Sequence, residues 1–274
     1  MLERELQSAV EFARQAGAIL TEIYATDFDV AVKGDKSPVT EADTRANAHI
    51  VQALSERFPD DGVVGEESDD HDGALGRQRC WYVDPLDGTK EFVSRNGEFA
   101  VMIGLAIDGE SQLGVVYQPA KDKLYSGVVG GGAWLEVGAE RRELHVSGVA
   151  SPAELKLVVS RSHRSSEIDE IASGLGITDE SRSGSVGLKI GHIAEQAADL
   201  YVHVSDKASK WDACGPEAVV RAAGGRFTDL GGKPFVYQGT DMANRGGILA
   251  CNAAAYDAVL PVVQRVGRQA GYVE

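Results

Sequence analysis

The sequence predicts a layered fold of the mixed α+β and α/β type, and three observations support this. Residues 3–24 and 40–58 carry apolar residues at helical spacing. Residues 63–137 form short β-rich runs separated by Gly, Pro and Asp turns. Beyond them, strand-like and helix-like segments alternate. We therefore expect two closely packed halves, residues 1–148 and 149–274, with a hinge near GVASPAE and a cleft where they meet.

Two amphipathic helices open the chain. In the first, the apolar positions are Leu6, Val10, Ala13, Leu20 and Ile23. In the second, Thr40 is placed to cap the N-terminus, and an apolar face follows up to Phe58, directly before Pro59.

The first half should contain a largely antiparallel sheet. Its strands are expected in the runs VVG, CWYVD, FAVMIGLAI, LGVVYQ, KLYSGVV and AWLEV. In the second half, strands KLVVS and DLYVHV alternate with helices expected near 165–175, 187–198, 213–223 and 253–268.

The charge balance restricts the partners of this chain. Its net charge of −15 disfavours binding to long nucleic acids, which depends on Lys and Arg at phosphates, and suits cation binding or simple solubility. Cys80, Cys214 and Cys251 show no CxxC spacing, so neither a disulfide framework nor a zinc site is indicated. The charged N-terminal segment lacks the apolar run of a signal peptide or membrane helix. We expect a cytoplasmic protein without a membrane partner.

The string Asp84-Pro85-Leu86-Asp87-Gly88-Thr89 begins where the apolar run CWYV ends. Pro85 and Gly88 favour a sharp turn, which would bring Asp84 and Asp87 toward one point at a sheet edge. Two carboxylates that close repel each other unless a cation neutralises them. The alternative is a solvated turn capped by its own aspartates.

Two further segments supply carboxylates. GEES places Glu66 and Glu67 after another short strand, and WDACGPEAV places Asp212 at the start of a helix. Oxygen ligands from separate segments suit Mg²⁺, which keeps several waters for chemistry. Asp212 could instead serve only as a helix N-cap, and one carboxylate can do both.

Together, GEES, DPLDGT and WDACGPEAV resemble the inositol monophosphatase superfamily of lithium-sensitive, magnesium-dependent phosphatases, over nearly the whole chain. This resemblance implies an αβαβα layered sandwich. KGDKSPVTEAD and DPLDGTKEFVSRNGEFAV look like the 3′(2′),5′-bisphosphate nucleotidase branch, whose members convert 3′-phosphoadenosine 5′-phosphate to AMP and phosphate. An inositol monophosphatase or a fructose-1,6-bisphosphatase-type enzyme remains an alternative, and a metal-binding regulatory protein is the alternative outside enzymes.

The resemblance also implies the roles of individual residues. The metal ligands would be Glu66, Asp84, the Leu86 carbonyl, Asp87 and Asp212. Asp43 and Thr89 would activate the attacking water, and Glu67 would lie beside another metal-bound water. Substrate contacts are expected from Gly88, Thr89, Ser160, His163, Ser185, Lys189 and Asp212.

Some of these residues have structural alternatives. Thr40 and Asp43 also fit a capping box, Ser185 could only cap its helix, and His163 could be a surface histidine. Lys33 and Asp35 form either a solvated pair or a contribution to the site.

The implied mechanism is direct hydrolysis by a metal-activated water, with two or three Mg²⁺ ions at the site and inhibition by Li⁺. The expected partner is a small phosphorylated molecule, foremost adenosine 3′,5′-bisphosphate. The residues leave open a monomer or a homodimer, and a role in sulfur metabolism or in general phosphate recycling.

Overall fold

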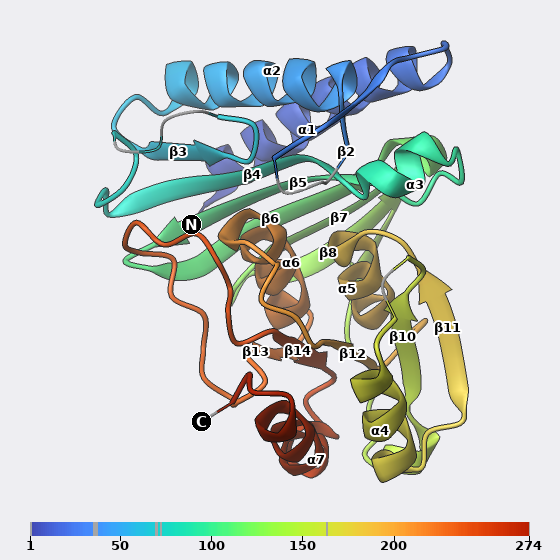
Figure 1. The fold of residues 1–274 in the computed structure, drawn as a ribbon. Helices are drawn as coiled ribbons and strands as arrows, with labels where there is room; N and C mark the ends of the chain where they lie inside the picture. Colours follow the sequence, from blue (N-terminus) through green and yellow to red (C-terminus); the bar gives the residue numbers. More distant parts are fainter. Residues whose placement is uncertain (1, 35–37, 69–70, 72, 163, 274) are drawn as a thin grey trace.

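The computed structural model describes residues 2–34, 38–68, 71, 73–162 and 164–273. Five layers are stacked in it: two helices, a seven-stranded sheet, two helices, a five-stranded sheet and two helices (Figure 1). The predicted αβαβα sandwich is therefore confirmed.

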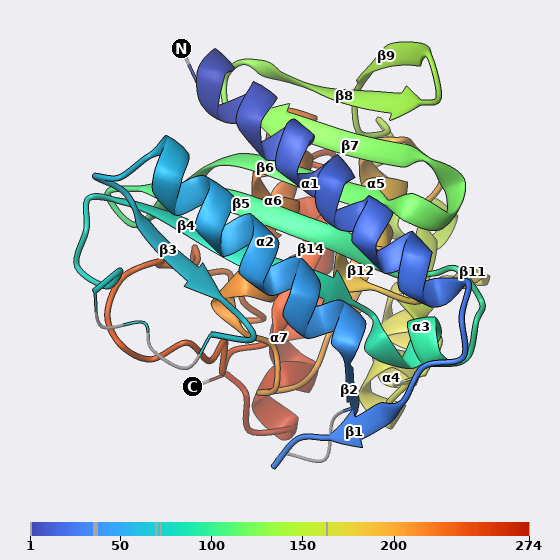
Figure 2. The ribbon, with the colours of Figure 1, turned by 90° about the horizontal axis from the view of Figure 1, so that it is seen from above.

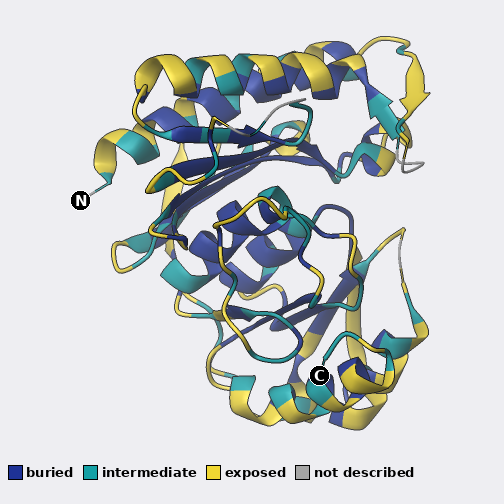
Figure 3. Ribbon diagram, turned by 60° about the vertical axis from the view of Figure 1, so that its left-hand side comes forward, coloured by how far each residue is buried: buried dark blue, intermediate teal, exposed yellow. Residues whose placement is uncertain are grey.

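The first layer is formed by α1 (Glu3–Tyr24) and α2 (Glu41–Arg57), which lie side by side across the large sheet (Figure 2). Their inner faces are buried and their outer faces are exposed (Figure 3). Both helices were predicted, and Thr40 is the N-cap of α2 as expected. Apolar periodicity sufficed because each helix buries a single face.

The seven-stranded sheet has the order β3-β4-β5-β6-β7-β8-β9. β3 pairs parallel to β4, and each later pair is antiparallel, which confirms the largely antiparallel sheet. Its strands are β3 (Gly62–Gly65), β4 (Arg79–Asp87), β5 (Ala100–Ile107), β6 (Glu110–Gln118), β7 (Lys123–Val128), β8 (Gly132–Val137) and β9 (Glu140–Leu144).

Between the sheets lie α5 (Val186–Ala194) and α6 (Lys210–Ala222). The helix α6 approaches the large sheet so closely that side chains are excluded from the contact. A Cβ at Gly114 would lie 1.9 Å from the carbonyl oxygen of Gly215, and one at Gly104 would lie 2.4 Å from its nitrogen. These glycines let the start of α6 reach the end of β4.

The five-stranded sheet has the order β11-β10-β12-β14-β13, with β10 parallel to β11 and β12, and β14 antiparallel to its neighbours. The last layer is α4 (Ser166–Leu175) and α7 (Tyr256–Gln269). The strands are β10 (Lys156–Ser160), β11 (Asp179–Ser183), β12 (Leu200–His203), β13 (Arg226–Thr228) and β14 (Ile248–Cys251).

Several element boundaries differ from those expected. The helix predicted to end at residue 198 ends at Ala194, and the helix predicted to begin at residue 213 begins at Lys210. Short elements escaped prediction because a few residues show no periodicity. They include β1 (Val30–Val32), β2 (Pro38–Thr40), α3 (Thr89–Val93) and the short 3₁₀ turns Pro119–Lys121 and Pro152–Glu154.

The division into residues 1–148 and 149–274 stays a prediction. Within the described part of the chain, every helix is too short or too polar to cross a membrane.

Candidate metal and phosphate site

The end of β4 forms the floor of the site. Its pairing with β5 shifts register between Asp84 and Asp87, so the strand bulges there. The Leu86 amide donates a hydrogen bond of 2.9 Å to Asp84 Oδ1, which tightens the bulge. Gly88 then takes a φ of 95°, a left-handed conformation that favours glycine, and α3 begins at Thr89. The sharp turn predicted between Asp84 and Asp87 is therefore wrong, because β4 runs on through Asp87 and a bulge in the strand brings the two side chains together.

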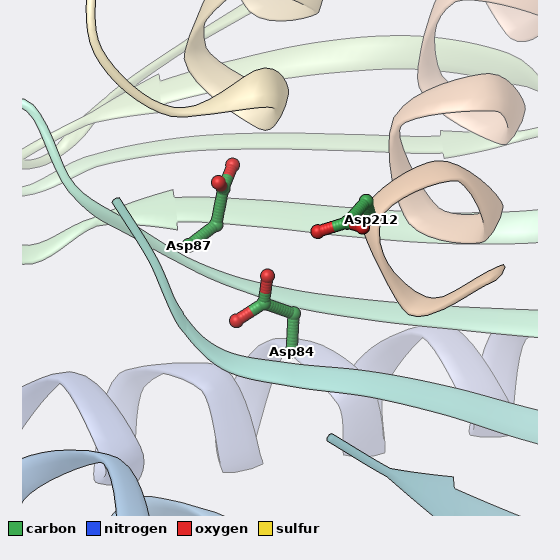
Figure 4. Close-up of side chains that lie close together, drawn as sticks. All are labelled: Asp84, Asp87 and Asp212. Carbon is green, nitrogen blue, oxygen red and sulfur yellow. The ribbon is translucent and has the colours of Figure 1, made fainter. Parts of the chain in front are cut away.

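The side chains of Asp84, Asp87 and Asp212 lie close together around a common space (Figure 4). Each offers a carboxylate oxygen, and these three atoms lie within 4.8 Å of one another. Asp84 and Asp87 are buried. Burial, followed by the charges of Glu66, Asp87 and Asp212, raises the pKa of Asp84 well above its usual value. Such a group of carboxylates is stable in ionised form only beside a cation.

Asp212 reaches this group from the first turn of α6. The Ser209 backbone amide donates to Asp212, and the two residues form a capping box with Ser209 as the N-cap. The alternative in which Asp212 itself is the N-cap is therefore wrong. Its position one turn into the helix still leaves a carboxylate oxygen facing Asp84 and Asp87.

Asp87 is held by the N-terminus of α5. Its Oδ2 atom accepts hydrogen bonds from the Ser185 hydroxyl at 2.5 Å and from the Gly187 amide at 2.9 Å. The Ser185 hydroxyl also accepts from the Leu188 amide at 3.1 Å, so Ser185 caps the helix and contacts Asp87, and the alternative in which it only caps the helix is wrong. Burial raises the pKa of Asp87, although the charge of Lys189 and these hydrogen bonds oppose the effect.

Asp43 and Thr89 form a second pair next to the bulge. Asp43 Oδ2 accepts from the amide and the hydroxyl of Thr40, each at 2.7 Å, so the alternative of a capping box is confirmed. Its other oxygen faces Thr89, whose hydroxyl lies 3.1 Å from Asp43 Oδ1 and 3.3 Å from the Leu86 carbonyl. Burial raises the pKa of Asp43. The capping role therefore leaves one oxygen available for chemistry.

Glu66 and Glu67 lie at the border of the site. The Lys33 ammonium is 2.9 Å from Glu66 Oε1 and also contacts Glu67. Glu66 is not in the 4.8 Å group, but its charge contributes to the raised pKa values of Asp84 and Asp212. Burial raises the pKa of Glu66 against the opposing charge of Lys33. Of the two readings of Lys33, the structure supports contact with the site, whereas Asp35 lies outside the described residues.

The donor set fits a hard divalent cation. Carboxylate oxygens from β4 and α6 converge, and the Leu86 carbonyl lies in the same bulge. Such oxygen ligands are those that Mg²⁺ prefers. Asp84, Asp87 and Asp212 are the residues placed to hold it, and Glu66 is close enough to add its charge.

A cleft of about 540 Å³ opens beside Asp212. Part of its lining, which we name the cleft wall, consists of Ser160, Ser162, Arg164 and Ser165. The lining also includes Tyr201, His203, Ser205 and Lys207. The predicted contact Ser160 thus lies in a cleft that Asp212 borders, while His163 lies outside the described residues.

Lys189 is buried behind this cleft. Its ammonium lies 5.0 Å from the centre of the Tyr201 ring. Burial lowers its pKa to about 8, against the opposing charges of Asp87 and Glu91. A substrate contact by Lys189 stays a prediction, and the environment shown is that of a counterion to the buried carboxylates.

Sequence reasoning missed the role of Glu91. It is buried in α3 and its Oε1 accepts a hydrogen bond of 2.6 Å from the Ser162 hydroxyl. The only signal was its position two residues after Thr89, within the DGTKE string.

Comparisons with known proteins agree with this geometry. The sequence profile of the inositol monophosphatase family matches residues 1–268. The 3′(2′),5′-bisphosphate nucleotidase CysQ of Escherichia coli K12 is 40% identical over 239 residues, covering 85% of this chain and 93% of that protein. A histidinol-phosphatase of Chlorobaculum parvum is 30% identical over 92% of this chain and 95% of its own length.

Solved structures show the same fold. CysQ from Bacteroides thetaiotaomicron, described as a bacterial member of the inositol monophosphatase family, has a TM-score of 0.76 and 32% identity, covering 92% of this chain and 98% of its own. The inositol monophosphatase of Thermotoga maritima has a TM-score of 0.82 and 26% identity, covering 98% of this chain and all of its own.

Fold and site define a layered α/β phosphatase with a cluster of carboxylates that could hold a metal ion. The chain belongs to the inositol monophosphatase family. It is accordingly an enzyme that acts on phosphomonoesters, as predicted.

Proposed function

We propose that this enzyme is a 3′(2′),5′-bisphosphate nucleotidase that removes the 3′-phosphate of adenosine 3′,5′-bisphosphate to give AMP and phosphate. The observation that carries the proposal is the cleft of about 540 Å³ that begins at Asp212. Its volume is that of a typical small-molecule site. A phosphate at the carboxylate group would leave the rest of a nucleotide in this cleft. The relatives that carry the name bisphosphate nucleotidase support the same substrate class.

Under this proposal, each role expected from the family resemblance is assigned to a residue of the site. Asp84, Asp87, Asp212 and Glu66, with the Leu86 carbonyl, would hold Mg²⁺. Bound Mg²⁺ offsets phosphate charge and lowers the pKa of a water molecule. Thr89 would orient the attacking water through its hydroxyl, which is hydrogen-bonded to Asp43. Asp43 would accept the proton through Oδ1, since Oδ2 is engaged by Thr40.

Other contacts belong to the substrate. Gly88 and Thr89, at the start of α3, would face the reacting phosphate, while Ser160 and His163 would contact the nucleoside. Ser185 and Lys189 would act through Asp87, to which Ser185 is hydrogen-bonded. Glu67, paired with Lys33, would lie beside a further metal-bound water.

The experiment is phosphate release from a panel of substrates in the presence of Mg²⁺. We expect adenosine 3′,5′-bisphosphate to give the highest kcat/KM, above inositol 1-phosphate, fructose 1,6-bisphosphate and histidinol phosphate. Histidinol phosphate is included because one relative is a histidinol-phosphatase. A higher kcat/KM for any of the other three would overturn the proposed substrate, while the phosphatase class would stand.

Lithium provides an independent test of the metal chemistry. Li⁺ resembles Mg²⁺ in size but carries one charge fewer, so it should inhibit where Na⁺ at matched ionic strength does not. Equal effects of the two ions would contradict the proposal of two or three Mg²⁺ ions with a lithium-sensitive site.

The proposal extends to the cellular setting. All three cysteines are buried and free. This agrees with a reducing cytoplasm, where recycling of the nucleotide would serve sulfur metabolism.

A further inference from the structure

Glu91 and Glu98 flank the turn that leads from the DPLDGT string to β5. Both side chains reach away from their own sheet toward the cleft wall and the start of α5. Neither residue belongs to the carboxylate group formed by Asp84, Asp87 and Asp212. Their contacts are therefore not explained by metal binding.

Glu98 makes the more extensive set of contacts. Arg161 donates to both of its oxygens, from Nε and Nη2, each at 2.6 Å. The Gly184 amide donates to Glu98 Oε2 at 2.7 Å. Paired, two-pronged contacts between guanidinium and carboxylate fix orientation as well as distance. Glu98 thus joins the segment next to the cleft wall to the loop before α5.

Glu91 holds the wall at a second point. Its Oε1 accepts from the Ser162 hydroxyl at 2.6 Å, and Ser162 itself lines the cleft. The side chain of Glu91 fits only because residue 184 is glycine. A Cβ at Gly184 would lie 2.4 Å from Glu91 Cγ and 2.6 Å from the Glu98 carbonyl oxygen. The backbone of Gly184 is therefore packed between both carboxylate-bearing residues.

The residues that follow, at the N-terminus of α5, contact Asp87 of the candidate metal site. Ser185 and Gly187 donate to Asp87, whereas Gly184 donates to Glu98. The segment of Gly184 and Ser185 therefore contacts both Asp87, a predicted metal ligand, and Glu98, which lies outside the carboxylate group. The wall is tied to that second carboxylate through Arg161. These contacts hold the cleft wall and the candidate phosphate site in a fixed position relative to each other.

We infer that Glu91 and Glu98 are positioning residues that fix the cleft wall relative to the phosphate site, and that the preference for a nucleotide over a small phosphate ester depends on them. The inference rests on the proposed nucleotidase function. A small ester needs only the phosphate site, whereas a nucleotide also needs the wall. Loss of the positioning contacts should therefore raise KM for the nucleotide and leave kcat nearly unchanged.

The first variant is Glu98→Ala. Its KM for adenosine 3′,5′-bisphosphate should rise about tenfold with kcat within about twofold, and kcat/KM for inositol 1-phosphate should change less than about twofold. Glu98→Gln keeps an acceptor for the Gly184 amide and should fall between Glu98→Ala and the unchanged enzyme. The matched control is Glu136→Ala, because Glu136 is also a carboxylate paired with an arginine, at 26% side-chain exposure against 21% for Glu98.

A double-mutant cycle tests Glu91. If Ser162 acts through Glu91, then Glu91→Ala combined with Ser162→Ala should cost no more than the larger single effect. Additive losses would show that Ser162 contacts the substrate independently, which overturns the role of Glu91. Equal losses on both substrates, or unchanged KM in Glu98→Ala, would overturn the role of Glu98.

Hydrogen exchange separates this inference from the proposed function. Glu98→Ala should speed exchange at the Gly184 amide and in the peptide covering residues 157–165, and it should leave exchange in α7 unchanged. The control Glu136→Ala should leave the exchange of all these amides unchanged. If the unchanged enzyme shows no preference for the nucleotide, the proposed function fails, and faster exchange alone would still support positioning. Unchanged exchange at Gly184 would refute it whatever the substrate.

Discussion

The two ends of α5 hold carboxylates in opposite electrostatic states. At the N-terminal end, Asp87 is buried near Asp84 and Asp212, and burial raises its pKa despite two hydrogen bonds from the helix. At the C-terminal end, Glu195 accepts from Lys123 at 2.7 Å and from Tyr125 at 2.9 Å.

The pKa of Glu195 shows the result of its surroundings. Burial opposes its ionisation, but hydrogen bonds from His192, Lys123 and Tyr125 outweigh burial and lower the pKa to about 2. A helix C-terminus alone would disfavour a negative charge, so the neighbours decide the outcome. The Glu195 cluster has its cations built in, whereas the carboxylates around Asp87 share too few protein cations. Such an imbalance is typical of a functional site that recruits a cation.

The largest contrast should appear in activity. Asp87→Asn removes one charge from the metal-binding group and should lower kcat/KM by about a hundredfold or more at limiting Mg²⁺. Glu195→Gln should leave kcat/KM within about twofold, because Glu195 lies at the far end of α5. Steady-state phosphate release from both variants measures this. Near-normal turnover in pure, folded Asp87→Asn would remove Asp87 from the site.

Magnesium should stabilise only the first of the two regions. At about one hundred times its dissociation constant, a ligand specific for the folded state adds about 2.7 kcal/mol to the free energy of unfolding. We therefore expect Mg²⁺ to raise Tm by several degrees, and to raise it much less in Asp87→Asn. Glu195→Gln should keep the full shift. Equal shifts in the two variants in thermal melts would break the comparison.

Removal of the Glu195 charge, at the C-terminal end of α5, should lower the stability of the fold. Glu195→Gln should lower the free energy of unfolding by about 2 kcal/mol, after allowance for solvent screening. Because the folded pKa lies near 2, below the ordinary value of 4.5, the stabilisation by Glu195 is complete above pH 4.5. It is lost as the pH falls from 4.5 toward 2. Urea unfolding at pH 7 and at pH 3 should therefore show a larger difference between Glu195→Gln and the unchanged protein at pH 7.

The smallest effect concerns Lys189, one of the few cations near the carboxylates. Its buried position near the charges of Asp87 and Glu91 favours an effect on every substrate, while the contact with the nucleotide expected from the sequence stays a prediction. Lys189→Ala should lower kcat/KM by about tenfold toward the nucleotide and inositol 1-phosphate alike. His163→Ala should affect the nucleotide only. A nucleotide-selective loss in Lys189→Ala would restore the original expectation.

The sequence by itself determined that two carboxylates converge at the end of β4, and it determined much of the layer order. Asp84 and Asp87 lie close together in the sequence at a strand end, which was enough to predict that they converge, although a bulge and not a turn brings them together. The helices α1 and α2 could also be predicted, because the spacing of apolar residues along each segment is enough to indicate an amphipathic helix. Roles for Asp43 and Thr89 came from the family resemblance, and their hydrogen bond agrees with them.

Only the tertiary structure decided which distant groups meet. Asp212 approaches Asp84 because glycines on β5 and β6 admit α6, and Lys33 pairs with Glu66 and Glu67 across more than thirty residues of chain. The contacts of Glu98 with Arg161 and Gly184 likewise join separate layers. Charge state follows from these long-range neighbours and from burial, neither of which a local sequence pattern records. This is the physical reason why the charge states of Asp87 and Glu195, two carboxylates at the ends of one helix, could not be assigned before the fold was known.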